Sequence, residues 1–464
     1  MTRPLEIAVV GAGWAGLASA VEASLAGAHV TLFEMAPAPG GRARDVVSHG
    51  SVLDNGQHLC IGAYVETLRL LREVGVDEKT AFARSPLTLV DAEGHGLRLP
   101  HGAPLAAFVR AVVARRGWPW SARLALLRVA AGWRRSGFRC AAGDTVADLA
   151  SSLPDAVRRD FIEPICVAAL NTPASEASGS VFLRVLRDAL AGSAGGADLL
   201  LPRLPLGDVF PAPAQGWLAR HGATIRLAHR VERLDRLDGG EPDAGAGRPG
   251  PGDGADRAEG ADRIPGAWSV DGVHADRVIV AASAVEAARL AAPHAAEWAT
   301  TAAALRYEPI ATVYAQSERC RLPEPMLALR SDAARPAQFV IDRGQLGGPS
   351  GLLAFVISGA AAWVERGTAA IEAATLAQAA SELARHLGAP LELVRTVIEK
   401  RATFACTPAL VRPPIVVVPG LFACGDYIEG PYPATLEGAV RSGVAAARAA
   451  TTQSGENSSV KGRA

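Results

Sequence analysis

The chain has 464 residues, 49% of them hydrophobic, which is enough to bury the cores of roughly two to three domains. Its 47 Lys and Arg residues balance 47 Asp and Glu residues, so no net charge favours nucleic acid or an acidic substrate. The six cysteines include no CxxC pair, which argues against a zinc site or any other metal site of that type, argues against a dense disulfide framework, and makes the cytoplasm the expected compartment.

The first expected unit is a strand at residues 7–10, a glycine loop, a helix ending near residue 26, and a second strand at residues 29–33. In the GxGxxG loop the first glycine permits a tight turn, the second lets the backbone approach a pyrophosphate, and the third lets helix and strand pack closely. Glu34 ends the second strand and would accept hydrogen bonds from an adenosine ribose, which suits FAD or NAD. The cofactor-binding residues predicted here are Gly11, Ala12, Gly13, Ala15, Gly16 and Glu34. No basic and apolar leader precedes this unit, so we do not expect export through a signal peptide.

A second glycine pair follows at Gly40 and Gly41. Glycines let the backbone pass close to a ligand, and the guanidinium of Arg42 could lie on a pyrophosphate. A plain turn would use the same glycines, so both interpretations stay open at this point.

Residues 66–74 are predicted to form a helix, and residues 105–139 to form long amphipathic helices with Leu, Val and Trp on one side and arginines elsewhere. This basic stretch could dock on a membrane surface, such as the inner membrane, to collect a lipid-soluble substrate, or its arginines could simply keep an exposed face soluble. The longest nearly uncharged run, residues 351–364, is shorter than the ~20 residues that cross a bilayer, so any membrane contact is expected to be peripheral. Asn171 follows an apolar run and marks either a pocket lining or a helix end.

Strands are predicted at residues 224–234, 268–270 and 277–282. Residues 238–267 are mostly Gly, Asp, Pro and Ala, a composition that cannot bury enough surface to offset its ordering entropy, so we expect a disordered insertion there. Residues 451–464 are polar and are expected to form a flexible tail.

A second anchor for a flavin is predicted near the end of the chain. A strand that begins at residue 421 leads into Gly425 and Asp426, and a helix opens within residues 433–443. Asp426 could bind a ribityl hydroxyl, and the N–H groups near Thr435 and Leu436 could stabilise negative charge on the ring edge of a reduced flavin.

The N-terminal loop with Glu34, the segment Gly-Gly-Arg-Ala at 40–43 and the segments Ala-Cys-Gly-Asp at 423–426 and Pro-Ala-Thr-Leu-Glu-Gly-Ala at 433–439 together resemble the amine oxidase and phytoene desaturase superfamily of flavoproteins. This resemblance covers nearly the whole chain. More narrowly, four segments resemble the hydroxysqualene dehydroxylases of bacterial hopanoid synthesis: DNGQHLCIGAY at 54–64, ALNTP at 169–173, FVIDRGQLGG at 339–348 and RATFACTP at 401–408.

The resemblance implies an α/β fold with a Rossmann-like FAD-binding domain assembled from residues 1–74, 205–290 and 400–450. A mixed α+β substrate-binding domain would come from residues 75–204 and 291–399, which are rich in Leu, Ala, Val and Trp, as a pocket for a long isoprenoid must be.

The implied activity is that of an FAD-dependent oxidoreductase that reductively removes the hydroxyl of hydroxysqualene to give squalene. Hydride would come from N5 of the reduced flavin, which is recharged by an electron donor that the sequence does not specify. The alternative is a carotenoid-type or phytoene-type desaturase. An amine oxidase or a non-catalytic isoprenoid carrier fits less well, because the chain has only three lysines and keeps both flavin anchors.

By the same resemblance, Val231 at the end of its strand would hold the adenine through its backbone, and Gly56 and Gln57 would lie near the flavin ring. His58 is a candidate proton donor because its pKa lies near neutrality, although it could instead only hydrogen-bond the backbone or the flavin. Asp54 is a second candidate for a catalytic role, and Glu437 a third. Both carboxylates could instead act as caps. The cysteines that could lie near the flavin, or act as small buried apolar residues, are Cys60, Cys406 and Cys424.

Overall fold

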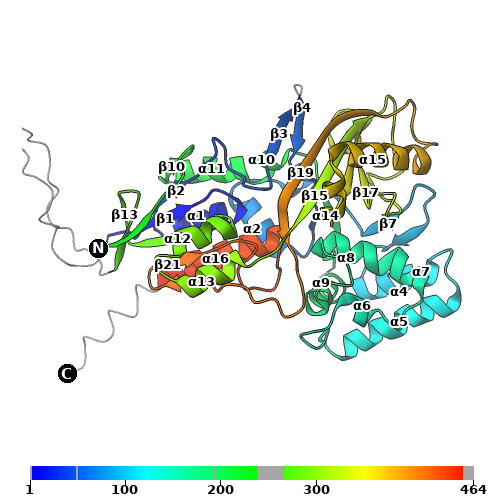
Figure 1. Ribbon diagram of the computed structural model, residues 1–464, viewed down its shortest axis with the longest axis horizontal. Helices are drawn as coiled ribbons and strands as arrows, with labels where there is room; N and C mark the ends of the chain where they lie inside the picture. The colour runs from blue at the N-terminus through cyan, green and yellow to red at the C-terminus, as the bar shows by residue number, and fades with distance from the viewer. Residues whose placement is uncertain (1–2, 49–50, 193, 238–265, 453–464) are drawn as a thin grey trace, which may run out of the picture.

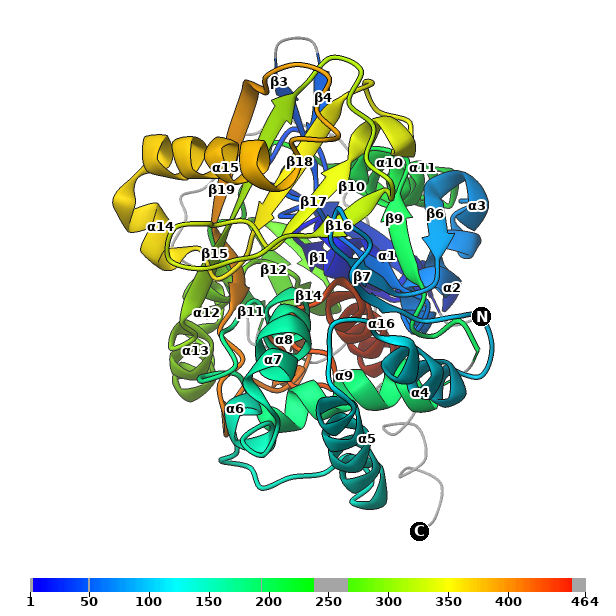
Figure 2. The same ribbon diagram turned by 90° about the vertical axis from the view of Figure 1, so that its right-hand side faces the viewer.

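The computed structural model describes residues 3–48, 51–192, 194–237 and 266–452. Its largest sheet lies on the left in Figure 1, a second sheet at the upper right, and a group of helices at the lower right. Figure 2 views the molecule from the side of the second sheet and the helices. The predicted insertion at 238–267 and the predicted tail at 451–464 fall almost entirely outside the described residues.

The largest sheet has six strands that come from the beginning, the middle and the end of the chain. Their order is β10 (Thr224–Arg226), β2 (His29–Phe33), β1 (Glu6–Val10), β14 (Arg277–Val280), β21 (Leu421–Ala423) and β20 (Val416–Val418). All neighbours pair in parallel except the edge pair β20 and β21. The carboxyl ends of the five parallel strands therefore meet at one edge of the sheet.

Helices cover both faces of this sheet, as the continuous apolar run of β1 requires. Ile7 and Val9 pack into a core with α1 (Trp14–Leu25), α11 (Pro211–Arg220) and α16 (Leu436–Thr452). Ala8 and Val10 point to the other face, where the core includes α12 (Ala284–Ala291) and α13 (Ala296–Ala303). The expected βαβ unit is confirmed to within about one residue at each strand end.

The second sheet is antiparallel, in the order β16 (Met326–Ala328), β17 (Phe339–Asp342), β18 (Leu352–Ile357), β15 (Tyr307–Gln316) and β19 (Glu392–Phe404). The long strand β19 runs from this sheet toward the six-stranded sheet (Figure 1) and crosses the expected boundary at 399/400. The division into two domains remains a proposal, and its last boundary is better placed after Phe404, where the strand ends.

Smaller sheets join these two. They are β11 (Leu234–Leu237), β12 (Ala267–Val270) and β13 (Val273–Ala275); β5 (Cys60–Ile61), β9 (Leu199–Pro202) and β6 (Phe82–Ser85); β3 (Asp45–Ser48) and β4 (Ser51–Asp54); and β7 (Thr88–Val90) and β8 (Gly96–Arg98). The remaining helices are α2 (Val65–Glu73), α3 (Glu78–Ala81), α4 (Pro104–Ala114), α5 (Trp120–Arg135), α6 (Val146–Leu149), α7 (Asp155–Val157), the π-helix η1 (Arg158–Ile162), α8 (Glu163–Leu170), α9 (Gly179–Ala191), α10 (Leu206–Val209), the 3-10 helix η2 (Arg343–Leu346), α14 (Ala361–Arg366) and α15 (Thr368–Glu382). No helix in the described ranges combines the length and the hydrophobicity that a bilayer crossing requires.

The single strand predicted at 224–234 is wrong. The chain forms β10, leaves the sheet, and begins β11 in another sheet, because Ala228 has a left-handed backbone (φ 53°) that no strand can contain. Val231 therefore lies between strands rather than at a strand end.

Asn171 ends α8 in the left-handed conformation, so the helix-end interpretation is confirmed. Its side-chain amide is fully used: Nδ2 donates to Thr403 Oγ1 at 2.9 Å, and Oδ1 accepts from the N–H of Gly359 at 2.6 Å.

Candidate functional site

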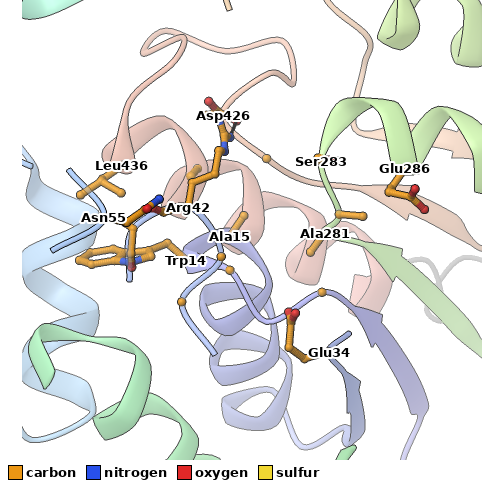
Figure 3. A pocket seen from close by; sticks show the side chains of 18 of the residues that line it. Trp14, Ala15, Glu34, Arg42, Asn55, Ala281, Ser283, Glu286, Asp426 and Leu436 are labelled. Atoms are coloured by element: carbon orange, nitrogen blue, oxygen red, sulfur yellow. Dashed lines mark hydrogen bonds and ion pairs between the residues drawn. The ribbon is translucent and has the colours of Figure 1, made fainter. Parts of the chain in front are cut away.

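A cavity of about 370 Å³ lies at the carboxyl ends of the parallel strands (Figure 3). Four of the five parallel strands contribute residues that lie just after their ends: Gly11 and Gly13 after β1, Glu34 after β2, Ala281 to Ser283 after β14, and Gly425 and Asp426 after β21. This edge is where parallel sheets bind dinucleotides.

Glycines make the wall of the cavity by close backbone approach. A Cβ on Gly16 would lie 1.8 Å from the carbonyl oxygen of Gly11, and a Cβ on Gly11, whose φ is +108°, would lie 2.7 Å from the carbonyl oxygen of Ala281. The first turn of α1 contains no acid and its N-cap, Gly13, makes no side-chain cap bond, so the N-terminus of α1 faces the cavity with its amide groups and positive dipole end. This arrangement suits a pyrophosphate.

Glu34 is held rigidly at the end of β2. Its two carboxylate oxygens accept the N–H of Ala12 at 2.6 Å and that of Ala36 at 2.8 Å, and the residue still lines the cavity. Ala12 and Gly16 do not line it, because the first binds Glu34 and the second packs against the loop backbone.

Arg42 and Asp426 lie in contact in the wall of the cavity, although they are far apart in the sequence (Figure 3). Arg42 Nη2 donates to Asp426 Oδ1 at 2.5 Å, and its Nη1 donates to the carbonyl of Ala402 at 2.8 Å. Burial would lower the pKa of Arg42, but the Asp426 carboxylate outweighs it and raises that pKa. A fixed cation and a fixed anion therefore lie side by side in the cavity wall.

The loop at 56–58 also lines the cavity. Gln57 Nε2 donates to Tyr314 Oη at 2.8 Å, and His58 Nδ1 lies 2.9 Å from the carbonyl oxygen of Gly56. Burial lowers the pKa of His58, and the hydrogen bond to Gly56 only partly opposes this. Since a carbonyl can only accept, the neutral ring carries its proton on Nδ1 and offers Nε2 as an acceptor.

Asp54 lies behind this loop and does not line the cavity. Its Oδ1 accepts the N–H of Leu206 at 3.0 Å, and its Oδ2 accepts from Gln57 Nε2 at 3.4 Å. Burial raises the pKa of Asp54 to about 6, although the charge of Arg343 opposes the shift. These bonds favour an anchoring role for Asp54.

Glu437 is fully buried and caps α2. Its carboxylate accepts the N–H groups of Glu66 and Thr67 at 3.1 and 3.0 Å, and Arg441 Nε donates to it at 2.6 Å. The cap interpretation accounts for this residue. The buried thiols of Cys60, Cys406 and Cys424 line neither this cavity nor the apolar pocket described next.

A second, apolar pocket of about 190 Å³ adjoins the first cavity, and Thr435 lines both. Its walls include residues of the helices α4, η1, α8 and α9, of β16 and β17 in the second sheet, and of the smaller strands β7, β8 and β9. The bulkier apolar residues among them include Leu97, Leu99, Phe108, Phe161, Ile165, Val185, Leu190, Met326 and Phe339. A hydrocarbon is the ligand that such walls suit.

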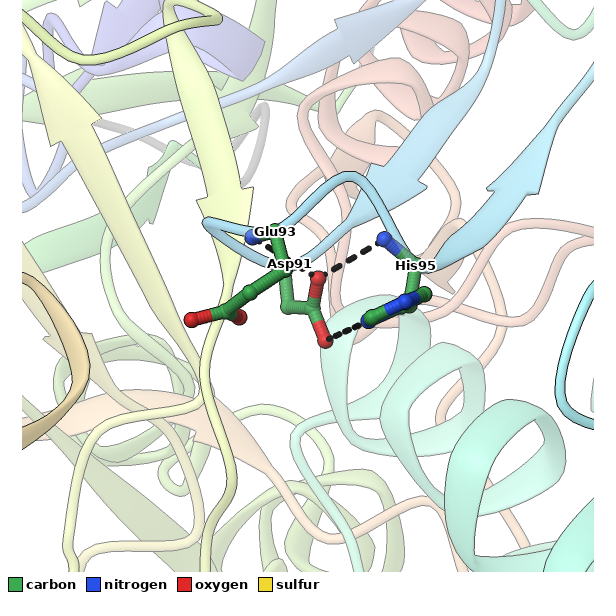
Figure 4. Close-up of side chains that lie close together, drawn as sticks. All are labelled: Asp91, Glu93 and His95. Carbon is green, nitrogen blue, oxygen red and sulfur yellow. Dashed lines mark hydrogen bonds and ion pairs between the residues drawn. The ribbon is translucent and has the colours of Figure 1, made fainter.

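Asp91, Glu93 and His95 lie together in the turn between β7 and β8 (Figure 4). Asp91 Oδ1 accepts the N–H groups of Glu93 and His95 at 3.1 and 2.8 Å. Hydrogen bonding within this exposed turn accounts for the arrangement, so we assign it no metal.

Comparison with known proteins decides the family. The profile of the family described as "Flavin containing amine oxidoreductase" matches residues 14–451. The chain belongs to this family. As a flavin-containing amine oxidoreductase, the protein is an FAD-dependent oxidoreductase.

Relatives within the family include two proteins named hydroxysqualene dehydroxylase. The one from Zymomonas mobilis is 28% identical over 49% of this chain and 54% of its own length, and the one from Rhodopseudomonas palustris is 24% identical over 95% and 96%. The alignments to the first relatives thus span about half of their length. A zeta-carotene desaturase of Zea mays is 35% identical over 23% of this chain and 20% of its own length. An oxidoreductase structure from Methanosarcina mazei shares the fold, with a TM-score of 0.69 at 17% identity over 96% of this chain and all of that one.

The cavity of this flavin-containing amine oxidoreductase fits FAD. The glycine loop and the N-terminus of α1 would hold the pyrophosphate, Glu34 the adenosine ribose, and Asp426 the ribityl chain. The predicted residues that line the cavity are Gly11, Gly13, Ala15, Glu34, Gly41, Arg42, Gly56, Gln57, His58, Val231, Gly425, Asp426, Thr435 and Leu436. The carbonyl of Val231 accepts Arg289 Nη2 at 2.7 Å, which leaves its N–H for an adenine.

Several cavity residues were not predicted. Ala281, Ala282 and Ser283 follow β14, and their position at the carboxyl end of the strand predicted at 277–282 is the signal that could have found them. The cavity is also lined by Trp14, Asn55 and Thr403, which lie within the segments 11–16, 54–64 and 401–408 but carry no predicted role, and by Glu399, which lies outside every such segment.

Proposed function

We propose that the protein removes the hydroxyl of hydroxysqualene reductively and yields squalene for hopanoid biosynthesis. One observation carries the proposal: an apolar pocket adjoins the cavity that suits FAD, and Thr435 belongs to both walls. Two relatives that bear the name hydroxysqualene dehydroxylase support it.

The reaction replaces a C–O bond by a C–H bond and releases water, so it consumes one hydride and one proton. A bound reduced flavin supplies the hydride from N5. The apolar walls bind the hydrocarbon and exclude water. His58 is the proposed proton-handling group, because it lines the cavity and its lowered pKa makes its protonated form a stronger donor. For Asp54 we propose a positioning role through Gln57.

The test is anaerobic incubation of the protein, with its FAD chemically reduced, with hydroxysqualene. Stoichiometric squalene together with flavin reoxidation is the expected result. A flavin that stays bound and reduced, without squalene, would refute the proposal. A carotenoid-type desaturase is the second candidate, favoured by the zeta-carotene desaturase relative, and oxidised enzyme with polyene substrates tests it.

We propose an anionic membrane surface as the source of this lipid substrate. Residues 94–143 contain nine arginines and no Asp or Glu, in a chain whose overall charges balance. On α4 and α5, at the end of the molecule away from the six-stranded sheet (Figure 1), four apolar side chains are exposed; we call them the α4–α5 patch. They are Val109, Val113, Trp120 and Leu124, and Trp120 is 61% exposed.

Contacts between α4 and α5 hold the two halves of the α4–α5 patch together, and α4 also lines the apolar pocket. Arg123 lies over the ring of Trp120 at 4.6 Å and donates to the carbonyl of Val113 at 2.6 Å, which joins the ends of the two helices. Phe108, next to Val109, lines the apolar pocket from inside. Apolar side chains among arginines suit the interface of an anionic bilayer.

Replacing both Trp120 and Leu124 by Ser should weaken binding to vesicles that contain phosphatidylglycerol about tenfold, because two apolar side chains no longer enter the interface. Co-sedimentation of the protein with the vesicles measures this binding. The matched control is Val411→Ser, which removes an apolar side chain that is 73% exposed elsewhere. Equal binding of the wild-type protein to neutral phosphatidylcholine vesicles, or an unchanged double variant, would contradict this docking surface.

A further inference from the structure

The apolar pocket is polar at one place only. Of the residues that line it, Tyr64, Asp188, Tyr432 and Thr435 are those with polar side chains. All the others are Leu, Ile, Val, Ala, Phe, Met or Pro. We call these four residues the polar end of the pocket.

Hydrogen bonds join the members of the polar end. Tyr432 Oη donates to Asp188 Oδ2 at 2.6 Å, although the two residues are 244 positions apart. Thr435 Oγ1 donates to the carbonyl of Tyr432 at 2.9 Å, and a side-chain hydrogen bond links Thr435 to Tyr64. Since Thr435 also lines the FAD cavity, the polar end is the end that faces that cavity.

Two arginines keep the carboxylate of Asp188 charged. Arg184 Nε donates to Oδ2 at 2.9 Å, and Arg187 Nε donates to Oδ1 at 3.1 Å. Burial works against the charge of Asp188, but the hydroxyl of Tyr432 and the two arginines overcome it and lower the pKa of this carboxyl. The pKa of Tyr432 is raised by its burial and by Asp188, so its hydroxyl keeps its proton.

The position of that proton decides what Tyr432 can do for a ligand. The hydroxyl donates to Asp188, and Arg184 donates a hydrogen bond to its oxygen, so one lone pair remains available to accept a hydrogen bond from a ligand. The Asp188 carboxylate polarises the hydroxyl into a better acceptor. The ring is held between Arg441 at 4.8 Å and Arg184 at 5.5 Å, so the hydroxyl has a fixed direction.

We infer that the polar end, through the hydroxyl of Tyr432 oriented by Asp188, is a binding site for the hydroxyl of a long-chain alcohol whose hydrocarbon fills the rest of the pocket. A hydrocarbon without a hydroxyl would leave the remaining lone pair of the Tyr432 hydroxyl facing apolar atoms, which costs binding free energy. The inference deepens the proposed function, on which it rests for the choice of hydroxysqualene as the probe. It assigns Tyr432 to binding and Asp188 to positioning.

The experiment measures selectivity, not turnover. Radiolabelled hydroxysqualene and squalene are bound at equilibrium to the oxidised holoenzyme in detergent micelles, and the ratio of their dissociation constants is compared between variants. The wild-type protein should prefer the alcohol, and Tyr432→Phe should lower this preference about tenfold while squalene binds as before. Asp188→Asn should lower it less, because a neutral amide polarises the hydroxyl weakly.

Tyr427→Phe is the matched control. Its hydroxyl is buried, has no hydrogen-bond partner among the described residues and lines neither the cavity nor the pocket, so the preference should not change. A wild-type protein without preference for the alcohol would overturn the inference, and so would a preference that survives both Tyr432→Phe and Asp188→Asn. A preference that these variants lose, in a protein that forms no squalene when its flavin is reduced, would uphold the inference and refute the proposed function.

Discussion

Gly16→Ala is expected to weaken FAD binding about 100-fold. The new Cβ would lie 1.8 Å from the carbonyl oxygen of Gly11, so the glycine loop and α1 must move apart. An overlap of this kind costs about 3 kcal/mol when the backbone has to shift. This cost disfavours the loop conformation that binds FAD, so the affinity for FAD should fall about 100-fold. Titration of apoprotein with FAD, followed by flavin fluorescence, measures the change.

Gly132→Ala is the control for this substitution. Gly132 is also a helical glycine, in α5, but a Cβ there would meet no atom within 4 Å. The affinity of Gly132→Ala for FAD should equal that of the wild-type protein. An unchanged FAD affinity in Gly16→Ala, with circular dichroism showing an intact fold, would contradict the close approach of loop and helix on which the cavity is built.

The parts of the site that the sequence predicts are those whose physics is local. The strand, the glycine loop and the helix after it are adjacent in the chain, and Gly16 is required by Gly11, five residues away. For the same reason β2 is predicted at the residues where it lies, His29–Phe33. The close approach of Gly11 to Ala281, by contrast, depends on the fold. The strand at 224–234 fails because its apolar alternation hides Ala228, whose left-handed backbone no side-chain pattern reveals.

Residues whose role depends on distant partners are not predictable in this way. Tyr432 and Asp188 meet only because the fold brings α9 and the loop before α16 together at one end of the pocket. Asp54 stands beside a glycine-rich loop and therefore resembles a catalytic acid, but its main partner is the N–H of Leu206, 152 positions away. The same carboxylate in sequence can serve chemistry or architecture, and only the fold decides between them.

The pH dependence of the free energy of unfolding of Asp54→Asn should show whether Asp54 acts in the chemistry or as a structural anchor. The pKa of Asp54 rises from 3.8 to about 6 on folding, so the folded state binds its proton more tightly than the unfolded state. Such a group stabilises the fold below pH 3.8, and the contribution is lost as the pH rises through about 6. At roughly 1.4 kcal/mol per pKa unit, the loss is about 3 kcal/mol. Asn keeps the acceptor for Leu206 and has no charge to bury.

The free energy of unfolding of Asp54→Asn, relative to the wild-type protein, should therefore rise by about 2 kcal/mol between pH 4 and pH 7, because the rest of the change falls below pH 4. Urea unfolding of the FAD-loaded proteins at both pH values measures it. Asp155→Asn is the control, because it replaces a carboxylate whose side chain is 82% exposed. Comparing the two variants isolates the effect of burial. If the difference between the Asp54 variant and the wild-type protein stayed constant with pH while squalene formation vanished, Asp54 would act in the chemistry and not as an anchor. A difference that rises with pH, with turnover retained, would leave proton handling to His58.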